Sequence, residues 1–202
     1  MIKAVIFDLG GVCFIDATQR VIEMFKSDYG IPEERSYDVL SVKSEIGKLY
    51  RKGKISSREF WSKALAELGA KEDYRRFLKA WVDSPEIKGT VNIARKLNKK
   101  GVKLFFLSDN VKERADILHR KFKVMKYFRD GIFSNVVRKI KSEGKELFLM
   151  ALNKTGEEAK DVVYIDDKPE NVKMAEKVGM IGIDFKNPEQ LEKELKLLGI
   201  KF

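Results

Sequence analysis

The sequence has 202 residues, 44% of them hydrophobic, and its one cysteine is Cys13. This length fits one large domain or a core with a smaller insertion, and a single cysteine excludes an internal disulfide and a cysteine-based metal cluster. No apolar run approaches the roughly 20 residues that span a bilayer, and no secretory leader pattern is visible. We therefore expect a cytoplasmic protein that does not enter a membrane.

The charge balance is basic, with 41 Lys and Arg residues against 31 Asp and Glu residues and a net charge of +10. Such a charge can indicate a nucleic-acid partner. Here the basic residues are spread along the chain and mixed with acids, without an arginine-rich tract or an aromatic platform. We expect the charge to attract small anions such as phosphates and predict no nucleic-acid partner. The sequence does not indicate the oligomeric state.

The chain begins with an apolar run at residues 2–7 that is typical of a buried strand. Residues 16–85 then contain no clear strand. Amphipathic patterns in this stretch predict helices over 18–29, 36–50, 57–68 and 71–82. This part is predicted to be an all-helical insertion, with Trp61, Phe77 and Trp81 as buried anchors.

Strand and helix patterns alternate after residue 85. The predicted strands are 102–107, 131–134, 162–165 and 180–185, and the predicted helices are 91–99, 112–122, 145–154, 169–178 and 188–198. Such alternation indicates an α/β fold, a Rossmann-like parallel sheet with helices on both faces. We expect a core domain of residues 1–15 and 86–202 interrupted by a helical domain at 16–85.

Polar residues stand where three of these strands end. Asp8 follows the first strand and precedes Leu9, Gly10 and Gly11, Ser108-Asp109-Asn110 follow the second, and Asp166-Asp167 follow the fourth. Because sites in open parallel sheets lie at the carboxyl ends of the strands, we expect these side chains to meet. An aspartate beside exposed backbone N–H groups is suited to act as a nucleophile on an anionic group.

These residues form four motifs that together resemble the haloacid dehalogenase-like hydrolase superfamily, over nearly the whole chain. The motifs are Phe7-Asp8-Leu9-Gly10-Gly11-Val12, Ser108, a lysine best matched by Lys141, and Ile165-Asp166-Asp167-Lys168-Pro169-Glu170-Asn171. The first motif most resembles the phosphatase domain of epoxide hydrolases and related sugar-phosphate phosphatases. The helical insertion resembles the α-helical cap of this superfamily.

The resemblance implies a role for each motif. Asp8 would be the nucleophile, Ser108 would donate a hydrogen bond to a phosphate oxygen, and Lys141 would neutralise both the nucleophile and the phosphate. Lys139 and Lys145 compete with Lys141 for that role. Leu9, Gly10 and Asp109 would join Ser108 in binding the substrate.

The resemblance also implies a Mg²⁺ site, with Asp8, Asp167 and the Gly10 carbonyl as ligands and Asp166 as a partner through water. A physical reason supports a cation here. An aspartate and a phosphate monoester are both anionic, and their repulsion at about 3 Å amounts to several kcal/mol even at an effective dielectric near 20. A divalent cation that bridges the two removes this penalty.

Gly10 departs from the family pattern, because phosphatases of this superfamily usually have a second aspartate there as general acid and base. We expect a Mg²⁺-dependent phosphomonoesterase that acts on a small organic phosphate, possibly a sugar phosphate, through an aspartyl-phosphate on Asp8. Two alternatives stay open: a low-turnover protein that binds a phosphate ligand or a partner, and a metal-free 2-haloacid dehalogenase. Asp166 and Asp167 disfavour the dehalogenase, since an aspartate that attacks carbon needs no cation.

Overall fold

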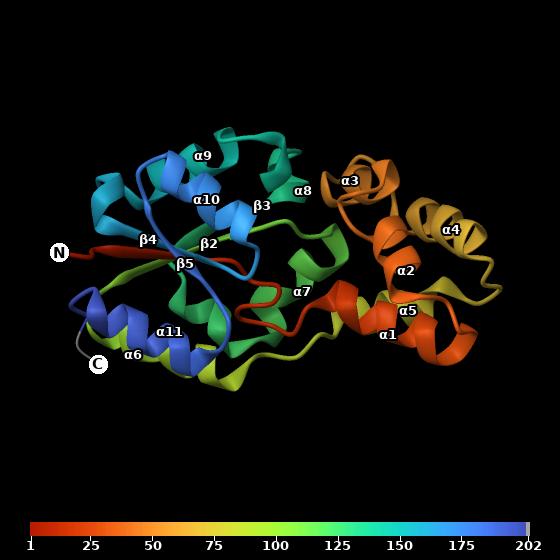
Figure 1. Cartoon of the computed structure of the whole chain (residues 1–202), viewed down its shortest axis with the longest axis horizontal. Coiled ribbons are helices and arrows are strands. Elements are labelled where there is room, and N and C mark those ends of the chain that lie inside the picture. The colour runs from red at the N-terminus through yellow and green to blue at the C-terminus, as the bar shows by residue number, and fades with distance from the viewer. Residues whose placement is uncertain (201–202) are drawn as a thin grey trace.

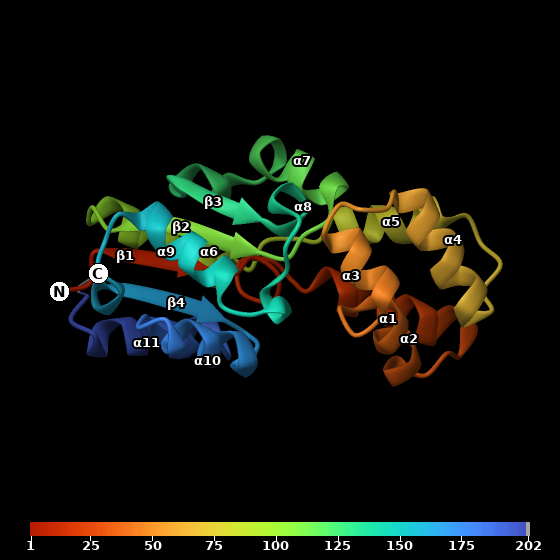
Figure 2. The ribbon, with the colours of Figure 1, turned by 90° about the horizontal axis from the view of Figure 1, so that it is seen from above.

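The computed structural model describes residues 1–200 and contains one five-stranded sheet. The strand order is β3-β2-β1-β4-β5, and every neighbouring pair is parallel (Figure 2). The strands are β1 (Ala4–Phe7), β2 (Lys103–Ser108), β3 (Asp130–Phe133), β4 (Val162–Asp166) and β5 (Ile181–Asp184). The predicted fold class is therefore confirmed, with strand ends shifted by one or two residues.

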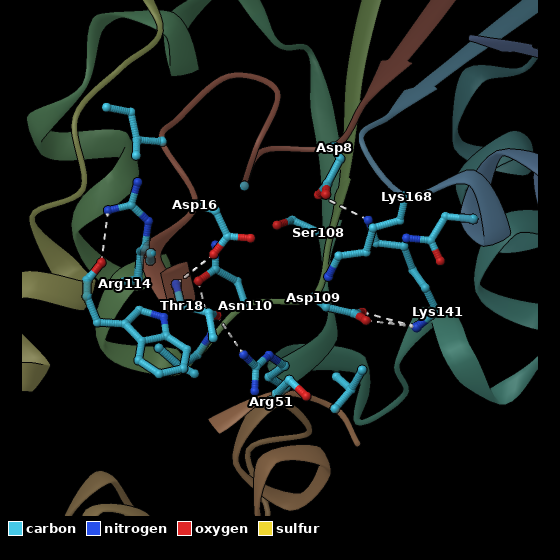
Figure 3. A pocket seen from close by; sticks show the side chains of 18 of the residues that line it. Asp8, Asp16, Thr18, Arg51, Ser108, Asp109, Asn110, Arg114, Lys141 and Lys168 are labelled. Carbon is cyan, nitrogen blue, oxygen red and sulfur yellow. Dashed lines mark hydrogen bonds and ion pairs between the residues drawn. The ribbon is translucent and has the colours of Figure 1, made fainter. Parts of the chain in front are cut away.

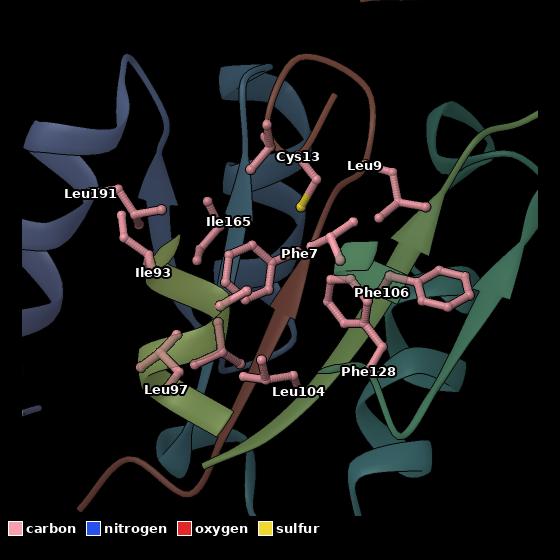
Figure 4. Packing of buried hydrophobic residues seen from close by; sticks show 14 of the residues in the cluster. Phe7, Leu9, Cys13, Ile93, Leu97, Leu104, Phe106, Phe128, Ile165 and Leu191 are labelled. Carbon is pink, nitrogen blue, oxygen red and sulfur yellow. The ribbon is translucent and has the colours of Figure 1, made fainter. Parts of the chain in front are cut away.

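Helices cover both faces of the sheet (Figure 1). One face packs on α6 (Lys88–Lys99), α7 (Lys112–Lys121) and α11 (Pro188–Leu197), and the other on α9 (Glu146–Thr155) and α10 (Pro169–Lys177). Alternation along β1 sends Val5 and Phe7 to the first face and Ala4 and Ile6 to the second. Figure 4 shows the first of these clusters, in which Phe7 packs beside Phe106 and Phe128.

Short elements that the sequence did not predict complete the connections. They are η1 (Lys123–Tyr127), α8 (Ser134–Val137), η2 (Lys141–Glu143) and η3 (Ala159–Asp161). Within residues 1–200, no helix combines the length and apolar character needed to cross a bilayer.

The insertion lies beyond the carboxyl ends of the strands (Figure 2). Its helices are α1 (Ala17–Tyr29), α2 (Glu33–Leu40), α3 (Glu45–Arg51), α4 (Ser57–Leu68) and α5 (Tyr74–Val82). They enclose a hydrophobic cluster of their own, in which Trp61, Phe77 and Trp81 are buried, as expected, and Phe25 stacks on Phe77 at 4.4 Å. This separate cluster supports the division into a core and a helical cap, which remains our proposal.

The single helix predicted over 36–50 is wrong, because the chain breaks between α2 and α3. Ser41 adopts extended backbone, and the Ser44 side chain accepts a hydrogen bond from the Gly47 N–H at 2.9 Å and so caps α3. A Cβ at Gly47 would lie 1.9 Å from the Ser41 carbonyl oxygen, so only glycine fits there. The break positions Arg51, the last residue of α3, toward the core domain.

Candidate active site

Three charged side chains meet at the carboxyl ends of β1 and β4. The two strands are neighbours with Phe7 paired to Ile165, so Asp8 and Asp166 emerge side by side. The Lys141 ammonium lies between them, 3.0 Å from Asp8 Oδ1 and 2.7 Å from Asp166 Oδ2. All three side chains are less than a tenth exposed, so this ion triad is shielded from solvent.

Asp166 is fully engaged by the protein. Its carboxylate accepts hydrogen bonds from the Tyr164 hydroxyl at 2.6 Å, the Lys168 N–H at 3.0 Å and the Asn171 amide at 3.1 Å, in addition to Lys141. Burial by itself would raise the pKa of Asp166, but Lys141 and these donors lower it below its usual value. Asp166 is therefore ionised and holds Lys141 in place.

Asp8 and Asp167 are the two carboxyl groups whose negative charge the protein compensates least. Burial raises the pKa of Asp8 to about 8, although Lys141 opposes that effect, and raises the pKa of Asp167 to about 6, with Asp166 adding to it. Burial also opposes the charge on Lys141, but Asp166 and Asp8 outweigh it and raise the pKa of that ammonium. Lys141 contacts two of the three carboxyl groups, and Lys168 acts on Asp167 and Asp8 only through space. Part of the negative charge is therefore uncompensated, and the cluster attracts a further cation.

The Gly11 backbone lies directly against the Asp167 carboxylate and leaves room for it. The glycine has φ +78°, and a Cβ on it would lie 2.5 Å from Asp167 Oδ2. The other oxygen, Asp167 Oδ1, is buried without a hydrogen-bond partner in the described chain. A buried carboxylate oxygen is costly to leave unsatisfied, so Asp167 needs a partner that the protein does not supply.

The donor set fits a magnesium ion. Asp8, Asp166 and Asp167 each offer a carboxylate oxygen, and these atoms lie within 4.8 Å of one another. Mg²⁺ selects oxygen ligands and is commonly held by one or two carboxylates together with water. Since Asp166 is saturated by hydrogen bonds, Asp8 and Asp167 are the carboxylates best able to hold the ion directly.

A cavity of about 80 Å³ opens above this cluster (Figure 3). The core contributes Asp8, Ser108 and Lys141 to its wall, and the insertion contributes residues such as Arg51 and Trp81. Within residues 1–200 the Ser108 hydroxyl has no hydrogen-bond partner, so it is free to bind a ligand. The cavity thus combines a carboxylate, an ammonium and a hydroxyl around one enclosed space.

The structure brings together most of the residues predicted for substrate binding. Gly10, Ser108 and Asp109 line the cavity. The Leu9 side chain packs in the hydrophobic core, and its N–H donates to Asp8 Oδ1 at 2.7 Å. Both Asp109 carboxylate oxygens accept from the Lys141 N–H at 3.1 Å, so this side chain positions the lysine.

The three candidate lysines differ in burial. Lys141 is 4% exposed, whereas Lys139 and Lys145 lie on the surface. Only the Lys141 ammonium contacts Asp8, which favours it for the role that the motif assigns.

Sequence reasoning missed several residues of the site. Tyr164 lies two residues before Asp166 on β4, so strand alternation places both on one face, and this spacing was a usable signal. Asp16, Arg51 and Lys168 also line the cavity. Arg51 had no sequence signal, because its position depends on the break between α2 and α3.

Comparison with known proteins relates most of the chain to one family. The model of the haloacid dehalogenase-like hydrolase family matches residues 2–179. The chain is 24% identical over 184 residues to the sesquiterpene phosphatase astK of Aspergillus oryzae, a match that covers 90% of this chain and 88% of that protein. It is 36% identical over 85 residues to flavin mononucleotide hydrolase 1 of Arabidopsis thaliana, which covers 42% of this chain and about a third (34%) of that relative.

A solved structure shares the fold. A HAD family enzyme from Bacteroides thetaiotaomicron, in complex with magnesium and inorganic phosphate, superposes with a TM-score of 0.72 at 24% identity. The superposition covers 93% of this chain and 96% of that one. The fold of that structure therefore includes counterparts of both the sheet and the helical insertion.

The contact between Gly11 and Asp167 predicts that alanine substitutions at two adjacent glycines differ sharply in their effect on stability. Gly11→Ala forces an L-residue into positive φ and against a carboxylate, which should lower the free energy of unfolding by about 1–3 kcal/mol or more. Gly10→Ala is the control, because Gly10 is not at positive φ and a Cβ there meets no atom within 4 Å. Urea unfolding of both variants measures the difference, and equal stabilities would contradict it.

The ion triad predicts that replacing Lys141 destabilises the fold far more than replacing the nearby lysine Lys139. Lys141→Met removes the cation between two buried carboxylates and should cost about 3–5 kcal/mol of unfolding free energy. Lys139→Met changes an exposed lysine and should stay within about 0.5 kcal/mol of the wild type. Denaturant unfolding at pH 7 compares the two, and a loss in Lys139→Met as large as in Lys141→Met would refute the assignment.

Proposed function

This chain belongs to the haloacid dehalogenase-like hydrolase family, and from its site geometry we propose that it is a Mg²⁺-dependent phosphomonoesterase acting on a small organic phosphate. The observation that carries the proposal is the pairing of a buried Asp8–Lys141–Asp166 triad with the unpartnered carboxylate oxygen of Asp167. The first supplies a nucleophile beside a fixed cation. The second is a reason to expect a metal ion.

The relatives support phosphate esters over organohalides. Two curated relatives are named as a flavin mononucleotide hydrolase and a sesquiterpene phosphatase. The chain spans about a third of the first of these, and the two names describe different alcohols. They therefore support the type of bond that is cleaved and leave the leaving group to be argued from this chain's own cavity.

The reaction divides into two displacements at phosphorus. In the first, Asp8 forms a bond to phosphorus and the bond from phosphorus to the ester oxygen breaks, so the alcohol leaves with a proton taken from water. In the second, water attacks the phosphorus of the aspartyl-phosphate, its proton passes to solvent, and the Asp8 carboxylate is restored as inorganic phosphate departs. The sum is one phosphate ester and one water converted to one alcohol and one phosphate.

Each residue of the wall has a part in these steps. Asp8 Oδ1 accepts from Lys141 and from the Leu9 N–H, so Oδ2 is the oxygen left for attack. The Lys141 ammonium stabilises charge on the transferring phosphoryl group, and the Ser108 hydroxyl donates to one of its oxygens. A magnesium ion held by Asp8, Asp167 and the Gly10 carbonyl would supply further charge neutralisation.

Gly10 leaves the proton transfers without a positioned side chain. General acid–base catalysis by a positioned side chain typically raises a rate by about 10²- to 10⁴-fold. Leu9 and Gly11, on either side of Gly10, cannot carry protons. The enzyme should therefore favour esters whose leaving groups need little protonation.

The nucleophile is tested by the isosteric variant Asp8→Asn. It should lose phosphatase activity by about 10³-fold or more while keeping its fold. A phosphorylated Asp8 should also be recovered after acid quench of the wild type during turnover. Asp38→Asn, on the exposed face of α2, is the matched control and should keep full activity. Wild-type turnover by a folded Asp8→Asn protein would sink the assignment.

The metal site predicts opposite stability effects for two adjacent residues. In EDTA, Asp167→Asn removes an unpaired buried carboxylate and should stabilise the fold, whereas Asp166→Asn weakens four contacts and should destabilise it. In Mg²⁺ titrations of activity, Asp167→Asn should raise the half-saturating concentration more than Asp166→Asn. Activity that persists unchanged in EDTA would rule out the metal.

The space at Gly10 allows the missing acid to be restored. Gly10→Asp should fold, because φ is not positive there and the Cβ position is open, and it should speed alkyl-phosphate hydrolysis by about 10²-fold. Gly10→Ala controls for the added volume, and aryl phosphates should gain less. If alkyl turnover does not rise in a folded Gly10→Asp protein, another group already carries the proton.

A further inference from the structure

Arg51 is a buried cation without a carboxylate partner. Its residue is 6% exposed, and its guanidinium donates from Nη1 to the Leu40 and Gly47 carbonyls at 3.0 and 3.3 Å and from Nη2 to the Thr18 hydroxyl at 3.1 Å. Among residues 1–200 it forms no ion pair with an acid. A buried charge is costly unless an opposite charge compensates it, and this guanidinium lacks such a charge within the described chain.

The cation lies on the wall of the active-site cavity (Figure 3). It belongs to α3 of the insertion, across the cavity from the core residue Asp8. The guanidinium carbon is 5.1 Å from the centre of the Trp81 ring, and the ring restrains its plane. Its position is thus fixed before any ligand arrives.

The nearest carboxylates are already engaged elsewhere. Asp109 accepts the Lys141 N–H with both oxygens, and Asp16 caps α1 by accepting from the Thr18 and Gln19 N–H groups. Both act on Arg51 through space, but neither pairs with it. The positive charge therefore remains directed at the cavity.

Arg114 provides the contrast on the same wall. Its guanidinium is satisfied by the carbonyls of Trp81, Val82 and Ser84 and stacks 4.7 Å from the Phe14 ring. These contacts tie the end of the insertion to the core, which is a structural task. Arg51 has three recorded acceptors for five N–H donors, so it retains capacity for a ligand.

We propose that the substrate is a short phosphomonoester whose leaving group bears a second anionic group, a carboxylate or a phosphate, that pairs with Arg51. A planar guanidinium suits both anions through paired N–H donors. The cavity of about 80 Å³ is small, which fits a short chain. This inference rests on the proposed phosphatase function and specifies its substrate class.

Three esters with the same three-carbon chain test the class. They are 3-hydroxypropyl phosphate, which is neutral at its far end, 3-phosphonooxypropanoate, which ends in a carboxylate, and propane-1,3-diol bisphosphate. With Mg²⁺ and the full-length wild type, at least one anionic ester should exceed the neutral one in kcat/KM by about 10- to 100-fold. Whichever arm shows the gain identifies carboxylate or phosphate as the second anion.

Variants then assign the preference to Arg51. Arg51→Gln should bring the ratio of anionic to neutral kcat/KM close to one, mainly through KM, and Arg51→Lys should keep part of it. Arg35→Gln removes an exposed charge from α2, away from the cavity, and should keep the wild-type ratio. A ratio that falls equally in Arg51→Gln and Arg35→Gln would show only long-range attraction and would overturn the assignment.

An aryl ester separates a failure of this substrate-class inference from a failure of the proposed phosphatase function. Mg²⁺-dependent hydrolysis of p-nitrophenyl phosphate together with equal wild-type rates on all three propyl esters overturns the inference and leaves the phosphatase standing. No hydrolysis of any ester overturns both. If Arg51→Gln does not fold, the wild-type ratios and Arg51→Lys still decide the result.

Discussion

One buried ammonium, shared between the carboxylates of two adjacent strands, organises this molecule. Lys141 neutralises Asp166 and part of the charge on Asp8, and without it β1 and β4 would end in two facing anions in a dry site. Tyr164, Asn171 and the Asp109 carboxylate fix the members of the triad. Because Lys141 contacts only two of the three carboxyl groups and Lys168 acts on Asp167 only through space, part of the negative charge stays uncompensated, and a cation can bind there.

The sequence predicted the sheet well because its signals are local. Apolar runs identified all five strands to within a residue or two, polar residues ended three of them, and parallel topology brought Asp8, Ser108 and Asp166 together. Lys141 could not be separated from Lys139 and Lys145 with the same certainty, since burial distinguishes them and composition does not. The place of Arg51 in the site could not be predicted, because it depends on a turn in which the backbones of Ser41 and Gly47 pack closely together.

The division of labour between the two parts follows from where each residue originates. The groups of the proposed phosphoryl chemistry come from strand ends of the core, where backbone positions are fixed by the sheet. Residues on the opposite wall of the cavity, such as Arg51 and Trp81, come from helices of the insertion. Changes in the insertion can therefore alter selectivity while the triad keeps its geometry.

The hydrophobic cluster of the insertion has a consequence for cooperativity. Its buried members all belong to residues 17–82 except Val111, at the start of α7, so the two apolar interiors are nearly independent. Structures built this way open in separate units, each with its own free energy. Backbone amides of α1 to α5 would then exchange with deuterium through a lower-energy opening than those of β1, β2 and β4, and the same excursion would expose the cavity to solvent without melting the sheet.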